Sequence, residues 1–182
     1  METQTGTKTK WNLDASHSEI GFKVKHMMIS NVSGSFGKFD VTAETEEDDF
    51  SKAKIDFTAD VSSLSTGSTD RDAHLKSADF FDISKFPELR FVSEEMQKKS
   101  EGHFILHGDL TIKGVTNPVI LNVEFGGIGK DPWGNEKAGF TVTGKINRTD
   151  FDLKWNAALE TGGVLVSEEV KLYAELELLK KG

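Results

Sequence analysis

Residues 69–91 read TDRDAHLKSADFFDISKFPELRF, and this stretch departs from the pattern of the rest of the chain. It starts like a helix, because Thr69 and Asp72 have the spacing of a capping box. Pro87 disfavours a helical backbone at the residue before it, so we expect one short helix over about 68–78. A helix of roughly ten residues is marginal alone in water and has to dock on other elements. The side chains expected to dock it are Leu75, Ala78 and Phe81.

Most of the remaining chain alternates polar and apolar residues, the pattern of β-strands with one wet and one dry face. In residues 18–26, for example, Phe22 and Val24 fall on the dry side. No helical pattern separates successive runs, so we expect antiparallel strands in a sandwich or a barrel. No repeat or linker appears, which predicts a disordered tail at residues 1–9 and a single domain at residues 10–182. The turn signals between runs are Lys113-Gly114, Gly126-Gly127, residues 131–135 (DPWGN) and Gly162-Gly163.

Composition limits the class of protein and its partners. The formal net charge of −8 argues against binding to nucleic acid or to anionic membrane surfaces. No apolar run approaches the roughly 20 residues of a membrane-spanning helix, so no integral membrane segment is expected. The first residues lack the apolar stretch of a signal peptide, which predicts a cytoplasmic protein, or a periplasmic one if the chain is a trimmed mature form.

The sequence predicts no metal site, no cofactor and no catalytic residue. His103 and His107 are four residues apart, but in a strand this spacing spans about 13 Å, too far for one ion. Nucleophile-elbow, phosphate-loop and HExxH motifs are absent from the sequence, as is cysteine. His26 continues the dry face of its strand. It is either a strand-end histidine with a backbone partner or a polar group inside a cavity.

The aromatic residues leave a packed sandwich and a hollow barrel both open. The chain has 13 Phe and 3 Trp but a single Tyr. Phenylalanine forms an apolar wall without a hydroxyl that needs a partner. A barrel of about eight strands can hold either its own side chains or one small ligand. Periodicity does not distinguish the two.

Several motifs in order resemble one family along nearly the whole chain. They are residues 11–41 (WNLDASHSEIGFKVKHMMISNVSGSFGKFDV), residues 71–91, residues 106–121 (LHGDLTIKGVTNPVIL), residues 146–156 (INRTDFDLKWN) and residues 162–178 (GGVLVSEEVKLYAELEL). From about Trp11 to Leu178 the chain resembles the YceI-like family, a lipocalin-like group of polyisoprenoid-binding proteins. One departure is Asp152, where the family usually carries glycine, so a backbone with positive φ would fall on aspartate.

The resemblance implies an all-β, lipocalin-like extended antiparallel β-barrel of about eight strands, with the short helix near a barrel end. It also implies a non-enzymatic protein that carries or sequesters a long-chain isoprenoid or similar amphiphilic lipid, of the quinone or prenyl phosphate type. The residues expected to line the apolar cavity are Phe22, Val24, Phe39, Phe57, Leu75, Phe80, Phe81, Phe91, Phe140 and Trp155. The residues expected near the head group are His26, Arg71 and His74.

Two other functions remain open at this stage. The first is a compact, stress-associated structural protein whose barrel is filled by its own side chains. The second is an enzyme acting on a lipid head group, with His26, His74 or Arg71 as acid–base or anion-binding groups. The segment 69–91 is then either a permanent plug of the barrel mouth or a lid that lines the cavity. A homodimer is an assembly that the sequence also leaves open.

Overall fold

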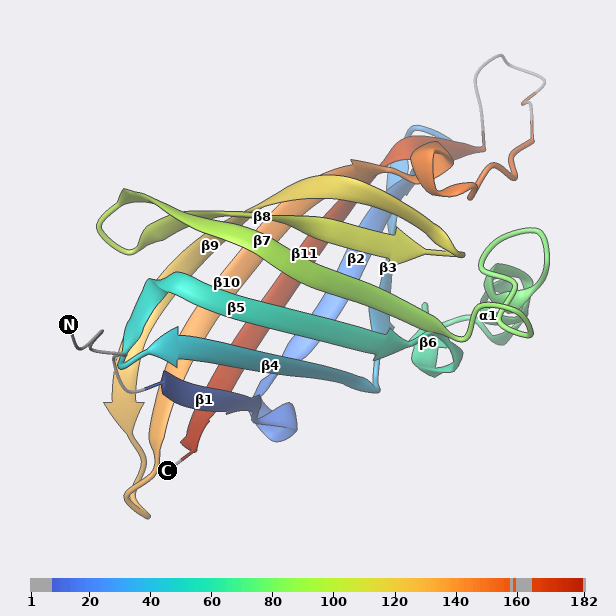
Figure 1. The fold of residues 1–182 in the computed structure, drawn as a ribbon. Helices are drawn as coiled ribbons and strands as arrows, with labels where there is room; N and C mark the ends of the chain where they lie inside the picture. The colour runs from blue at the N-terminus through green and yellow to red at the C-terminus, as the bar shows by residue number, and fades with distance from the viewer. Residues whose placement is uncertain (1–7, 158, 160–164, 182) are drawn as a thin grey trace.

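The computed structural model describes residues 8–157, 159 and 165–181, and its strands form one antiparallel sheet that closes into a barrel (Figure 1). The closed ring has the order β1-β4-β5-β7-β8-β9-β10-β11, and β11 pairs back onto β1. This confirms the predicted barrel of eight antiparallel strands, which β2, β3 and β6 extend. The strands are β1 Lys8–Leu13, β2 Glu19–His26, β3 Ser30–Phe36, β4 Phe39–Glu46, β5 Asp49–Asp60, β6 Leu64–Ser65, β7 Glu88–Ser100, β8 His103–Ile112, β9 Val115–Lys130, β10 Glu136–Asn147 and β11 Val166–Lys181.

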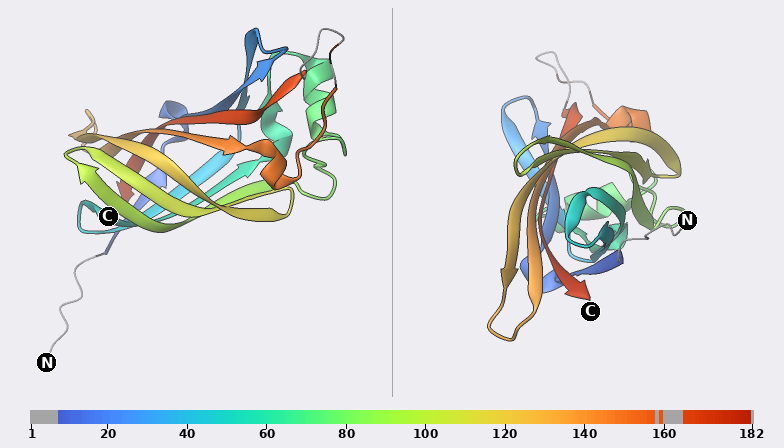
Figure 2. Two further views of the ribbon diagram at one scale, coloured as in Figure 1. Left: turned by 90° about the horizontal axis from the view of Figure 1, so that it is seen from above. Right: turned by 60° about the vertical axis from the view of Figure 1, so that its left-hand side comes forward.

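The long strand β11 is shared by two shorter strands. Its residues 178–181 pair with β1, and its residues 166–175 pair with β2. Between β1 and β2 the chain makes a 3₁₀ turn at Ala15–His17, and a bend at Gly37 and Lys38 separates β3 from β4. At one end of the barrel, therefore, β2 takes the place of β1 beside β11. From β2 the sheet continues through β3 and β6 (Figure 2).

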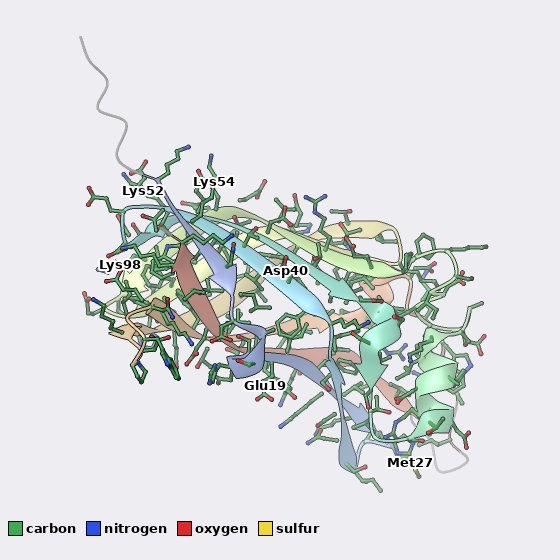
Figure 3. The ribbon with its side chains drawn as sticks, turned by 90° about the horizontal axis from the view of Figure 1, so that it is seen from below. Glu19, Met27, Asp40, Lys52, Lys54 and Lys98 are labelled. Atoms are coloured by element: carbon green, nitrogen blue, oxygen red, sulfur yellow. The ribbon has the colours of Figure 1, made fainter. Side chains whose placement is uncertain are left out.

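Toward the opposite end of the barrel, aromatic side chains pack against one another in the interior. Trp11 is fully buried, and its indole Nε1 donates a hydrogen bond to Thr45 Oγ1 at 3.0 Å. The Phe50 ring packs against Trp11 at 5.0 Å and against Phe140 at 4.8 Å. Charged side chains on the outer wall, such as Lys52 in Figure 3, point away from this core. The predicted alternation of wet and dry faces thus produces an apolar interior.

The helix α1 (Thr69–Lys76) lies within the predicted bounds and crosses the end of the barrel (Figure 2). The predicted capping box is wrong by one residue, because Ser68 is the N-cap and its side chain accepts from the Arg71 backbone N–H. Asp72 instead accepts from the backbone N–H and the hydroxyl of Thr66, at 2.8 and 2.6 Å. These bonds join the helix to the loop that follows β6.

The residues after α1 divide between the interior and the surface. Leu75 and Phe81 are half-buried and pack on the core, as predicted, whereas Ala78 is exposed and the expectation that it docks is wrong. Phe80 is buried. The ring of Phe86 does not join them, because it packs over Gly114, a turn residue with φ +75° between β8 and β9.

Four local predictions concern the loops and ends. The turn expected at Gly126-Gly127 is wrong, because both glycines lie within β9. Asp152 has φ 62°, so the positive φ expected there does fall on aspartate. The Gly162-Gly163 turn signal and residues 1–7 of the predicted tail lie outside the described residues. Lys8 and Thr9 already belong to β1, so the first strand begins two residues before the predicted boundary. Within the described residues, the structure contains no helix long and apolar enough to cross a membrane.

Candidate functional site

The interior of the closed barrel contains a cavity of about 190 Å³, called the inner cavity below. One water molecule needs roughly 10–15 Å³ of such space, so the inner cavity is far larger than a packing defect. Side chains from most of the ring strands line it, and nearly all of them are aliphatic or phenylalanine. An apolar cavity of this kind stays dry and favours an apolar occupant.

A second cavity of about 240 Å³, the outer cavity, lies beneath α1 at the end where β2 and β3 extend the sheet. The two cavities share five lining residues, which places them end to end along the barrel axis. The shared residues are Phe22, Phe36, Leu89, Ile112 and Leu172. The barrel thus contains one elongated apolar interior with two compartments.

The polar side chains that line the outer cavity are all basic. They come from the end of β2, from α1 and from the start of the 3₁₀ turn at Arg148–Phe151, and among the described residues no Asp or Glu lines this cavity. The inner cavity has no charged lining residue. The interior therefore has a wholly apolar end and a basic end. The basic residues are Lys25, His26, Arg71, His74 and Arg148.

Arg148 is a buried basic residue of the cavity wall that the sequence reasoning missed. Only 4% of it is exposed, and its guanidinium donates to the backbone carbonyls of Leu153, Trp155, Val166 and Ser167. Burial lowers the pKa of this arginine, and the charge of nearby Glu168 opposes that shift. The signal was present, since Arg148 lies two residues after inward-facing Ile146 and so continues the dry face of that strand.

The mouth of the outer cavity is built from α1 and the segment after β10. The His74 ring lies edge-on against Trp155 at 4.7 Å and against Phe80 at 5.1 Å. His74 Nε2 lies 2.9 Å from a carboxylate oxygen of Asp79, which orients the imidazole. Arg71 is held by Thr66, to whose hydroxyl and carbonyl oxygens it donates at 2.8 Å.

The structure places twelve of the thirteen predicted site residues on the cavity walls. Phe39 is the exception, because its ring packs against Phe57 at 6.4 Å without reaching either cavity. Phe57, Phe91 and Phe140 line the inner cavity, and Phe22 lines both. The remaining eight line the outer cavity: Val24, His26, Arg71, His74, Leu75, Phe80, Phe81 and Trp155. Ligand binding by these residues stays a prediction.

One group of side chains away from the cavities has the spacing of metal ligands. Atoms of Asp14, His17 and Glu177 lie within 4.8 Å of one another. The ammonium of Lys137 lies among them, 2.6 Å from Asp14 Oδ2 and 3.9 Å from Glu177 Oε2. The Lys137 hydrogen bond holds the pKa of Asp14 well below its usual range. This cluster is therefore an ion-pair network where β1, β10 and β11 meet.

Comparison with known proteins agrees with this architecture. A UPF0312 protein of Staphylococcus aureus (strain MSSA476) is 44% identical over 170 residues, which is 93% of this chain and 96% of that protein. The crystal structure of a Campylobacter jejuni YceI protein is 32% identical, with a TM-score of 0.73 and full coverage of both chains. Burkholderia cenocepacia BcnA shares the fold at 22% identity, with a TM-score of 0.77 over 91% of this chain and 98% of BcnA. Residues 11–178 match the YceI-like domain, and the chain belongs to the YceI-like family.

Proposed function

We propose that this protein binds a long-chain isoprenoid or a similar amphiphilic lipid inside its barrel and carries or sequesters it. The observation that carries the proposal is the elongated interior, wholly apolar at one end and lined with basic groups at the other. An amphiphile has the same polarity along its length. Each buried methylene contributes about 0.8 kcal/mol, so a long tail gives tight binding without directional contacts.

The relatives support this function at the level of the fold. A domain from Saccharophagus degradans, described as polyisoprenoid-binding, has a TM-score of 0.64 over 94% of this chain and 98% of its own. Its sequence is 14% identical, so the likeness concerns the fold alone. The basic outer cavity suits the head group of either class expected from the sequence, a quinone or a prenyl phosphate.

The alternative of a compact structural protein without a ligand requires a barrel filled by its own side chains, and the two cavities argue against it. An enzyme would need an acid–base pair near the head group. His74 and Asp79 lie 2.9 Å apart and would form such a pair, so substitution rather than geometry decides this alternative. We propose that the residues of the outer cavity bind the lipid without transforming it. Unchanged turnover in a variant lacking His26, Arg71 and His74 would remove the candidates for catalysis.

Extraction of the purified protein with organic solvent, followed by mass spectrometry, tests the proposal directly. A prenyl chain is expected in the extract, and delipidated protein is expected to bind a 20-carbon prenyl lipid in titration. If well-folded protein yields no lipid and binds no prenyl chain, the proposal fails.

A blocking variant makes this test specific to the interior. Ala174 lines the inner cavity, so Ala174→Phe places a ring in the space proposed for the tail. We expect at least tenfold weaker binding of a 20-carbon chain and a smaller loss for a 10-carbon chain, because the shorter chain does not reach the ring. The control is Val92→Phe, which adds a ring at a position that is 42% exposed and lines neither cavity.

A further inference from the structure

The turn between β2 and β3 exposes three apolar side chains in a row. Met27, Met28 and Ile29 are all exposed, and Ile29 is 81% exposed. The other large apolar side chains that are exposed in the described part of the chain occur separately along it: Val92, Ile120, Ile128 and Trp133. Single exposed apolar residues are common on protein surfaces, whereas adjacent ones form the kind of patch that marks a contact with a partner.

The backbone of this turn is costly for the residues that it carries. Met27 and Met28 have φ 54° and 59°, and the Ile29 N–H donates to the His26 carbonyl oxygen at 3.2 Å, which closes the turn. A turn with two successive residues at positive φ favours Asn-Gly. The other non-glycine residues with positive φ in the part of the chain that the structure describes are all charged: Glu47, Asp82, Lys113 and Asp152. Local strain combined with exposed apolar side chains indicates that the methionines serve a contact outside the fold.

The hairpin that carries the turn is free of acidic residues. Residues 20–39 contain Lys23, Lys25 and Lys38 but no Asp or Glu, in a chain with 30 acidic residues. Lys23 and Lys25 are exposed on the strand that leads to the turn. A lysine stem can lie along apolar surface while its ammonium reaches the polar head groups of a bilayer. The net charge of −8 opposes attachment by charge alone, so the apolar side chains have to supply most of the attraction.

The turn follows directly on the wall of the outer cavity. Lys25 and His26 line that cavity, as does Leu165, whose carbonyl oxygen accepts a hydrogen bond from the Met27 N–H at 2.7 Å. In Figure 2 the blue β2–β3 hairpin lies at the same end of the barrel as α1. Whatever binds the turn is therefore held at the end of the barrel that contains the outer cavity.

We infer that Met27, Met28 and Ile29 insert into the interface of a phospholipid bilayer and hold the outer cavity against it while lipid passes between bilayer and barrel. This inference rests on the proposed function and adds the partner that supplies or receives the lipid. Three side chains at the apex of a turn are too few for a second protein, because a stable protein interface takes roughly 20–30 residues from each side. They suit a bilayer, which buries apolar side chains at the boundary between head groups and acyl chains. Methionine side chains are flexible and adapt to such an irregular environment.

The first test measures insertion of the turn. Because the chain has no cysteine, Ile29→Cys can carry a single environment-sensitive fluorophore, and Ile120→Cys can carry the same label on the outer wall. Ile120 is the matched control, since it is 59% exposed and lines neither cavity. With phosphatidylcholine vesicles we expect the emission of the Ile29→Cys label to shift to the blue and that of the Ile120→Cys label to stay unchanged. An unchanged emission from both labels overturns the inference.

Substitutions assign vesicle binding to the turn. Ile29→Asp is expected to reduce the partition of the protein into phosphatidylcholine vesicles about tenfold, the effect of burying one fewer large apolar side chain. Ile120→Asp should leave this partition unchanged. Met27→Asn combined with Met28→Gly should also reduce it, although Asn-Gly suits the turn and should make the fold more stable. A loss of vesicle binding in a more stable protein is not an effect of unfolding.

Docking on a bilayer changes the rate of lipid exchange but not the affinity of the barrel for its ligand. Uptake of a 20-carbon prenyl lipid from vesicles by delipidated Ile29→Asp should be about tenfold slower, in proportion to the docked fraction. Titration with a 10-carbon prenyl alcohol dissolved in water should give the affinity of the unaltered protein, because Ile29 lines neither cavity.

The outcomes separate this inference from the proposed function. If the dissolved alcohol binds but vesicle binding is absent or unaffected by Ile29→Asp, the docking is refuted and the lipid-binding function stands. If the turn inserts but neither lipid binds, the lipid-binding function fails and the turn is a membrane contact alone. If the unaltered protein binds no vesicles and Ile29→Asp dissociates a dimer in sedimentation, the turn is an interface between copies of this chain, and the inference is overturned.

Discussion

Replacing Phe81 by alanine distinguishes a lid that contacts the ligand from a plug that only closes the barrel. Phe81 is half-buried, lines the outer cavity and packs edge-on against Phe36 at 6.4 Å. Burying a whole phenylalanine contributes roughly 1.5–3 kcal/mol, and half of that is lost here. The aromatic contact adds about 0.5–1 kcal/mol, whereas no new closed cavity forms beside the existing one. We expect Phe81→Ala to lower the free energy of unfolding by about 2 kcal/mol.

The same segment provides a matched control in Phe86. It is also half-buried, but its ring covers Gly114 outside the cavities. Phe86→Ala should therefore cost a similar free energy of unfolding, about 1–2 kcal/mol. It should change lipid affinity less than about twofold.

Two assays separate stability from binding in this pair. Urea denaturation gives the free energies of unfolding, and titration of delipidated protein with a 20-carbon prenyl lipid gives the affinities. For Phe81→Ala we expect roughly tenfold weaker binding, because the ligand loses contact with one ring. If Phe81→Ala binds the lipid as tightly as Phe86→Ala does, Phe81 is part of a permanent plug and the assignment of a lid is refuted.

Three further predictions concern stability. Met27 and Met28 have φ 54° and 59° in an exposed hairpin turn, so replacing them by Asn and Gly should raise the melting temperature by roughly 2–8 °C. The lowered pKa of Asp14 stabilises the fold above about pH 4, so the deficit of Asp14→Asn in urea denaturation should be constant near neutral pH and shrink as pH falls below 4. Gly108→Ala places a Cβ 2.5 Å from a backbone oxygen and should cost about 1–3 kcal/mol in the same assay, whereas Gly129→Ala, with open space around it, should cost little.

The sequence predicted the strands well because alternation reports directly on which face of a strand is dry. The barrel of eight strands, the short helix and the positive φ at Asp152 all agree with the structure. The N-cap was misplaced by one residue, because Ser68, Thr69 and Thr66 are all capable of the same local hydrogen bonds. Neighbouring hydroxyl residues compete at a helix start, and only tertiary contacts decide between them.

The sequence predicted which types of residue line the candidate site, but not where along the interior each side chain lies. Phe39 was expected to line the cavity, yet neither alternation nor the resemblance says which part of the interior a side chain reaches. Phe86 packs on a turn from two strands away, a contact that no local pattern encodes. Arg148 was overlooked because charged residues are rarely buried, although its place in the alternation pointed inward.

The break in the strands and the helical segment have a common physical cause. An eight-stranded ring is narrow enough for wall side chains to occupy much of its interior, and around Trp11 and Phe50 packed aromatic rings border the inner cavity. Where β1 gives way to β2 beside β11, the sheet continues through β3 and β6. The outer cavity lies at this end, beneath α1. Residues 69–81 supply part of its cover, because Leu75, Phe80 and Phe81 line the outer cavity, and the basic residues that line it are found at the same end.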